Sequence, residues 1–203
     1  MKTPPRPRPA RDRGFTLIEL LVVVTIIAML AAGAYGAYSI MLDKGKAVDA
    51  RGAMTTVQNA ITSFERDYDR LPNPTSATKG TDCETDTGSE ENLIGVLKGL
   101  ESSVDQNPRR TDYLGEIKEA KVIKDQKLAG LYRDTEETIG LYDPWGNVYK
   151  MKMDLDGDGK LENPDTGAAS GGTGTLHKSV IIYSPGKDKN PMTWTDNISS
   201  WQQ

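Results

Sequence analysis

One carboxylate stands inside the longest apolar stretch of the sequence. Residues 15–38 are predominantly apolar, and Glu19 is the single charged residue among them. A charge within a helix of bilayer length costs at least ~2.5 kcal/mol, so an acid at such a place is a functional position that requires a partner. No basic residue within the stretch can be that partner.

A second group of acids, spaced two residues apart, lies within residues 154–165. Their order fits the twelve-residue calcium loop, with acids at positions one, three and five, a backbone carbonyl at seven and an acid at twelve. These residues are Asp154, Asp156, Asp158, Lys160 and Asp165. The alternative is an acidic turn that binds nothing, but neighbouring carboxylates repel one another without a cation. We therefore expect calcium at this loop.

Positive charge and proline mark the segment before the apolar stretch. Residues 1–14 contain four prolines and a single acid, Asp12, against Lys2, Arg6, Arg8, Arg11 and Arg13. An excess of basic residues retains a flank in the cytoplasm, so we expect a cytoplasmic leader at 1–14. We then expect residues 15–38 to form a transmembrane helix that crosses the membrane once, and residues 39–203 to form one domain on the far side.

Composition excludes several classes of function. The net charge is −4 and the basic residues are scattered, so no nucleic-acid surface is expected. Cys83 is the single cysteine and His177 the single histidine, which excludes an internal disulfide and a histidine-rich zinc site. A Cys83–His177 nucleophilic pair has no supporting signature, and we expect no enzyme.

Hydrophobic spacing predicts an α+β domain built on a long helix. Apolar residues recur in steps of three and four as far as the proline-containing segment 71–74, which predicts a helix from Phe15 to about residue 71. The stripe is interpreted as core packing, with a coiled coil as the alternative, and it comprises Ala47, Ala50, Met54, Val57, Ile61, Phe64 and Tyr68. Residues 75–91 are expected to form a loop, 91–100 a short helix, and 148–153 and 179–183 strands. Residues 101–138 are ambiguous, with helix or strand edges expected around 116–127.

The segment Arg13-Gly14-Phe15-Thr16-Leu17-Ile18-Glu19-Leu20 resembles the leader junction of type IV pilins and type II secretion pseudopilins. The resemblance implies cleavage between Gly14 and Phe15 by the prepilin peptidase, and N-methylation of Phe15. It also implies that Glu19 pairs with the new N-terminal ammonium of an adjacent subunit, which removes two buried charges together. A plain signal anchor is the alternative.

Two further segments resemble the major pseudopilin. One is Asp143-Pro144-Trp145-Gly146-Asn147-Val148-Tyr149, and the other is the chain end from Asp196 to Trp201. The resemblance implies a pilin-like fold, with the long helix packed on a small antiparallel sheet. It also implies a second calcium position at Asp188 and Asp196, with Asn197 where a second acid is common. Either acidic loop could hold the ion, or both, and the role would be structural.

The function implied by the resemblance is that of a pseudopilus subunit in a type II secretion system. The expected partners are copies of the chain itself, minor pseudopilins, the prepilin peptidase, the membrane and the inner-membrane secretion platform. Type IVa pilins generally carry a disulfide-bounded C-terminal loop, which a chain with Cys83 alone cannot form. The open alternatives are a type IV pilus subunit, a calcium-dependent binding module on a membrane stalk, and an anchored hydrolase.

Overall fold

The computed structural model describes residues 15–78, 80–115, 117–122, 126–166 and 174–202. The predicted leader, including Gly14, lies outside these ranges. The chain divides into two compact units, Met1–Asp43 and Lys44–Gln203, and the division falls inside the first helix. We call them unit 1 and unit 2 and describe each separately.

The described part of unit 1 is helical. Helix α1 covers Leu17–Tyr68, so it begins two residues after the predicted start and extends into unit 2. In unit 1 its large apolar side chains are exposed, with Leu17 82% and Met29 74% exposed. None of the helices in the described part of the chain has the length and apolar character that a bilayer span requires.

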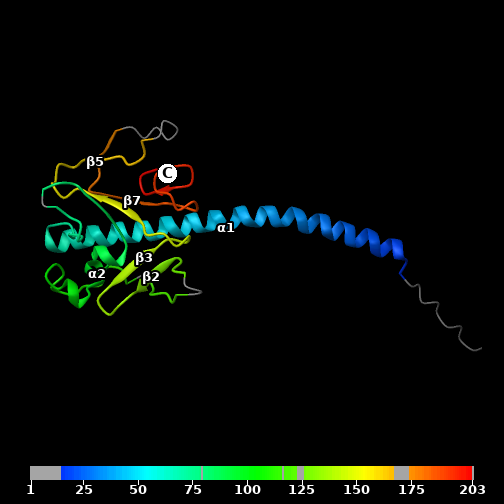
Figure 1. Cartoon of the computed structure of the whole chain (residues 1–203), viewed down its shortest axis with the longest axis horizontal. Coiled ribbons are helices and arrows are strands. Elements are labelled where there is room, and N and C mark those ends of the chain that lie inside the picture. Colours follow the sequence, from blue (N-terminus) through cyan, green and yellow to red (C-terminus); the bar gives the residue numbers. More distant parts are fainter. Residues whose placement is uncertain (1–14, 79, 116, 123–125, 167–173, 203) are drawn as a thin grey trace, which may run out of the picture. The chain divides into compact units, whose positions relative to one another are not determined.

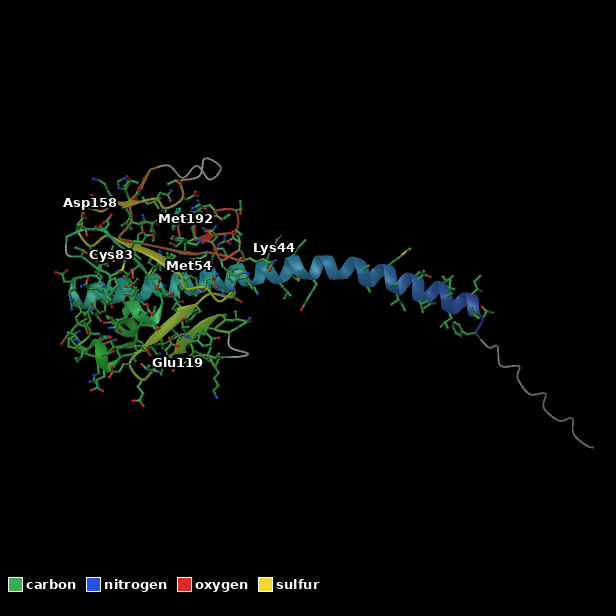
Figure 2. The ribbon with its side chains drawn as sticks, in the orientation of Figure 1. Lys44, Met54, Cys83, Glu119, Asp158 and Met192 are labelled. Carbon is green, nitrogen blue, oxygen red and sulfur yellow. The ribbon has the colours of Figure 1, made fainter. Side chains whose placement is uncertain are left out.

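The second part of α1, drawn in cyan in Figure 1, runs through the middle of unit 2. The predicted stripe is confirmed as core, because its central members are at most 1% exposed while Ala47 and Tyr68 pack against them partly buried. Figure 2 labels Met54, one of these residues, where α1 lies among the side chains of unit 2. The helix ends at Tyr68, and Asp69 follows with a φ of 54° before the prolines.

A four-stranded antiparallel sheet packs on α1. Its strands are β1 (Cys83–Asp86), β4 (Lys150–Met153), β7 (Val180–Ser184) and β8 (Ile198–Ser199), in the order β1-β4-β7-β8. Met151 on β4 and Ile182 on β7 are fully buried and belong to the same hydrophobic core as the stripe of α1. The predicted strands 148–153 and 179–183 are therefore confirmed as β4 and β7.

Two strand pairs and a short helix complete unit 2. Strands β2 (Gly130–Arg133) and β3 (Ile139–Tyr142) form one antiparallel pair, and β5 (Leu161–Glu162) and β6 (Thr175–Leu176) form another. Helix α2 (Leu93–Lys98) confirms the predicted short helix and lies between the 3-10 turns Ser89–Glu91 and Glu101–Ser103. In Figure 1, α2, β2 and β3 lie on the other side of α1 from β7.

The prediction of a loop over 75–91 is wrong for part of that range, since β1 lies inside it. The segment is rich in polar residues, but Cys83 and Thr85 point inward while Glu84 is exposed, an alternation that pairs the strand with β4. The ambiguous range 101–138 includes β2, whose Leu131 forms an isolated bridge with Glu119. The charged segment around 116–127 therefore contains a strand edge, one of the two structures expected there.

Candidate functional site

The first described turn of α1 is closed by two side chains from opposite ends of that turn. Glu19 Oε2 accepts hydrogen bonds from the Thr16 amide N at 2.8 Å and from Thr16 Oγ1 at 2.7 Å. In return, the Glu19 amide N donates to Thr16 Oγ1 at 3.3 Å. This reciprocal arrangement is a capping box, in which the acid satisfies an amide that the helix leaves unpaired. Within its own chain, Glu19 is thus engaged by Thr16.

Next to this turn, the aromatic ring of Phe15 is 82% exposed. Gly14, on the leader side of the predicted cleavage position, lies outside the described residues. The role of Thr16 was missed from the sequence, although the signal was present: a threonine three residues before a glutamate, at the start of an apolar run, predicts this cap.

The loop after β4 is organised by its acids. Asp154 is buried, with its two carboxylate oxygens accepting from the amide N of Gly157 at 2.7 Å and of Gly159 at 2.8 Å. Asp156 Oδ1 accepts from the Asp158 amide at 3.1 Å, and Asp158 Oδ1 from the Lys160 amide at 2.8 Å. Both glycines have positive φ, 78° and 74°, a conformation that other residues rarely adopt. The loop is therefore a tight acidic turn.

Carboxylates from two separate segments meet at this loop. Asp82, Asp154 and Asp156 each offer an oxygen, and these oxygens all lie within 4.8 Å of one another. Asp82 was missed from the sequence, since its proximity follows from the β1–β4 register, which pairs Cys83 with Met153 and so brings the preceding and following residues together. Burial raises the pKa of Asp82, and the charges of Asp156, Asp154 and Asp158 raise it further.

Two further predicted ligands, Asp158 and Asp165, lie outside the group of Asp82, Asp154 and Asp156. Asp158 is not in the three-carboxylate group found among the described residues, and Figure 2 labels it at the outer edge of unit 2. Its Oδ2 lies 3.7 Å from Lys160 Nζ. Asp165 is fully buried, and its Oδ2 accepts a hydrogen bond from Gln202 Nε2 at 3.0 Å. The structure thus groups Asp154 and Asp156 with Asp82.

The loop between β7 and β8, residues 185–197, contains the second predicted position; we call it the C-terminal loop. Asp196 Oδ2 accepts from the amides of Lys187 at 2.8 Å and Asp188 at 2.9 Å. Asp188 does not share this role, because its Oδ1 accepts from the Asn190 amide at 2.8 Å.

Two acceptor oxygens in the C-terminal loop are buried without a donor. They are Asp196 Oδ1 and Asn197 Oδ1, on adjacent residues. The amide nitrogen of Asn197 is used, since its Nδ2 donates to the Pro191 carbonyl at 3.0 Å. Buried acceptors of this kind call for a water or an ion, and oxygens from a carboxylate and an amide are ligands that calcium takes. The residues present therefore fit a hard cation.

A buried carboxylate organises the Asp-Pro-Trp-Gly segment next to this loop. Asp143 is 0% exposed and follows β3 directly. Its Oδ1 accepts from the amides of Trp145 at 2.9 Å and Asn147 at 2.8 Å. Its Oδ2 accepts from Asn147 Nδ2 at 2.9 Å and from Ser184 Oγ at 2.6 Å. The sequence did not reveal that this segment is bonded to the end of β7.

The residues considered for catalysis show no catalytic arrangement among the described residues. Cys83 is 4% exposed in β1, and burial raises the pKa of its thiol. His177 is exposed just after β6. Trp194 and Trp201 pack on each other and on Tyr183, with ring centroids 5.0 to 6.1 Å apart.

Comparison with known proteins adds two findings. Residues 9–35 match the family described as the prokaryotic N-terminal methylation motif. The chain is also 34% identical over 93 residues to the type IV major alpha-pilin of Moraxella bovis, in an alignment covering 43% of this chain and 58% of that pilin. No solved structure matches the chain. With an N-terminal helix followed by small antiparallel sheets, the motif and this similarity support a type IV pilin-like family, and the chain spans less than two thirds of the pilin it matches.

Proposed function

We propose that this chain is a filament subunit, cut between Gly14 and Phe15 by a prepilin peptidase, methylated on Phe15 and polymerised with copies of itself. The observation that carries this proposal is the methylation motif at residues 9–35, which includes the start of a helix whose apolar side chains are exposed around one acid. Exposed apolar area of this extent requires a covering partner, and the same helix of another copy supplies a chemically matching one.

The chemistry of assembly is an exchange of partners at Glu19. In the separate chain its carboxylate accepts from the Thr16 amide and hydroxyl. Cleavage before Phe15 creates an ammonium group, and an adjacent copy presents this group to Glu19 on joining the filament. The ammonium then brings a full positive charge to the carboxylate, so that two charges buried in the filament neutralise each other.

Before assembly, residues 15–38 are proposed to sit in the inner membrane as a single span. The N-terminus would be cytoplasmic and residues 39–203 periplasmic, with the growing filament in the periplasm. The support is the apolar character of this stretch together with the basic residues that precede it. Insertion before assembly would cover the exposed side chains of unit 1 until other copies replace the lipid.

The filament is proposed to be the pseudopilus of a type II secretion system, built on a secretion platform and with minor pseudopilins. The support is the Asp143–Tyr149 segment, and Cys83 as the single cysteine, which leaves no disulfide-bounded C-terminal loop. A surface type IV pilus is the second candidate, and it is favoured by the similarity to a protein named as a major pilin.

Structural calcium is proposed for unit 2. At the C-terminal loop the support is the pair of buried oxygens without donors, Asp196 Oδ1 and Asn197 Oδ1. At the loop after β4 it is the grouping of Asp82, Asp154 and Asp156. Bound calcium would neutralise these acids and fix the two loops, while the fold itself is held by the hydrophobic core.

Mass spectrometry of the chain purified from membranes of its host tests the central proposal. We expect a chain that begins at Phe15 and carries one added methyl group on its N-terminal nitrogen. A chain that retains residues 1–14 and does not self-associate would refute the proposal. Deletion of the gene then separates the two kinds of filament: loss of exported proteins indicates a pseudopilus, and loss of surface fibres indicates a pilus.

A further inference from the structure

The buried acid at the end of β3 has contacts that reach the C-terminal loop. We propose that Asp143 is a positioning residue for this loop and sets its affinity for calcium. The inference rests on the proposed calcium site at Asp196 and Asn197. Asp143 itself is fully buried among protein donors, so its effect must travel through the residues bonded to it.

Two routes lead from Asp143 to Gly186, the second residue of the C-terminal loop. In the first, Ser184 Oγ donates to Asp143 Oδ2 at 2.6 Å and accepts from the Gly186 amide at 3.0 Å. In the second, Asn147 Nδ2 contacts Asp143 Oδ2 at 2.9 Å and also donates to the Gly186 carbonyl at 2.8 Å. Both backbone polar groups of Gly186 are thus held by residues that Asp143 orients.

Gly186 in turn touches the candidate ligand. A β-carbon added to Gly186 would lie 2.4 Å from the Asp196 carbonyl O and 3.0 Å from Asp196 Oδ2, and its φ is +72°. The next two residues, Lys187 and Asp188, donate their amides to that same Oδ2. This leaves Oδ1 as the oxygen buried without a donor. The position of Gly186 therefore decides which Asp196 oxygen remains for a cation.

The charge on Asp143 is what makes this arrangement possible. Each of its oxygens accepts two hydrogen bonds, from backbone amides at Oδ1 and from Asn147 and Ser184 at Oδ2. An asparagine presents one oxygen and one NH2 group, so whichever way it is turned, its NH2 group meets donors. If the NH2 group faces Ser184, the serine hydroxyl can turn its hydrogen away, but the same NH2 group then meets Asn147 Nδ2, and the contact that orients this donor toward the Gly186 carbonyl is lost.

The same turn is also attached to α1 within unit 2. Lys46 Nζ lies 5.8 Å from the centroid of the Trp145 ring, and Trp145 packs against the hydrophobic core. Because this side of the turn is anchored on the helix, a change at Asp143 is expected to move the C-terminal loop rather than the turn. The loop leads into β8, which lies at the edge of the four-stranded sheet and pairs only with β7 among its described strands.

The test is Asp143→Asn in the full mature chain, with Asp156→Asn in the background so that calcium binding reports the C-terminal loop. Isothermal titration calorimetry should show a calcium Kd raised by about 10- to 100-fold, the usual effect of removing a group that orients a metal ligand. Hydrogen exchange in chelator should be faster at the Lys187 and Asp188 amides. Leu97→Ala, a cavity in buried α2, is the control: it lowers stability without changing the calcium Kd.

Ser184→Ala is the second variant, used in case Asp143→Asn does not fold. It removes one of the two routes and keeps the charge, so a smaller rise in Kd and faster exchange at Lys187 are expected. Unchanged affinity and exchange in these variants, with calcium binding intact in the parent chain, would overturn the positioning role. Absence of calcium binding by the parent would instead overturn the proposed site, and the calcium part of this inference with it.

Discussion

Replacing Glu19 with glutamine tests whether the charge of this residue drives assembly. Glutamine has nearly the same shape, and its carbonyl oxygen can still accept from the Thr16 amide and hydroxyl, which contact Glu19 Oε2 at 2.8 and 2.7 Å. The helix cap is therefore retained, while the charge that would meet the Phe15 ammonium of an adjacent copy is lost. Any defect then belongs to the contact between copies.

The size of the effect follows from the type of bond that is lost. A hydrogen bond to a charged group contributes about 1.5 to 3 kcal/mol. Since each 1.4 kcal/mol corresponds to a factor of ten in an equilibrium constant, each addition of a subunit should weaken by about 10- to 100-fold. Glu19→Ala should have at least this effect, because it removes the cap as well.

The assay separates insertion, processing and assembly in cells that produce the chain. Immunoblots of the membrane fraction report insertion, intact mass reports cleavage and methylation, and the sedimented filament fraction reports assembly. We expect the first two to be unchanged in Glu19→Gln and the filament fraction to fall at least tenfold, the lower end of the range above. Thr16→Val is the matched control, because it removes the hydroxyl contacts of the cap, worth about 1 kcal/mol, and leaves the charge. A normal filament yield from Glu19→Gln would refute the reasoning.

Three further predictions concern unit 2. Phe64→Ala should lower its free energy of unfolding by about 3 to 5 kcal/mol, measured by urea denaturation, because this ring is fully buried in the core. Asp82→Asn should raise the melting temperature in chelator and lower it in calcium. Because the pKa of Asp82 is raised in the folded state, its contribution to stability in chelator is present below that pKa and is lost as the pH rises through it. The melting temperature of the variant in chelator should not show this pH-dependent decrease. Calcium titration of the unaltered chain should show two sites, and Asp156→Asn and Asp196→Asn should each abolish one of them.

Elements in which apolar residues follow a regular local spacing could be predicted from the sequence. The stripe of α1 was predictable because its spacing of three and four residues places Met54, Ile61 and Phe64 on one face, and all three are buried. Strand β1 was missed because its outward residues and neighbours are acidic and threonine-rich. Its inward residues, Cys83 and Thr85, can be recognised as part of a strand only from their pairing with β4.

In the candidate sites, too, the residues that are close in sequence could be predicted, and those joined by long-range contacts could not. The acids of residues 154–165 are close in sequence and could be found by spacing, whereas Asp82 joins them through a register between strands that no local pattern contains. The bond from Ser184 to Asp143 is likewise long-range, and it depends on where β7 ends. Thr16 differs, because its capping pattern is local and the apolar run around it drew attention to Glu19 alone.

The two acidic loops close opposite ends of one strand pair, and this geometry limits what calcium can do. In the antiparallel β4–β7 pair, Lys150 lies opposite Tyr183 and Met153 opposite Val180. The loop that starts at Asp154 therefore leaves one end of the pair, and the C-terminal loop leaves the other. Between them, Met151 and Ile182 are buried in the core with α1. Ions at the two ends would fix both loops of unit 2 and add to its stability through binding, so calcium removal should reduce filaments by lowering the amount of folded subunit.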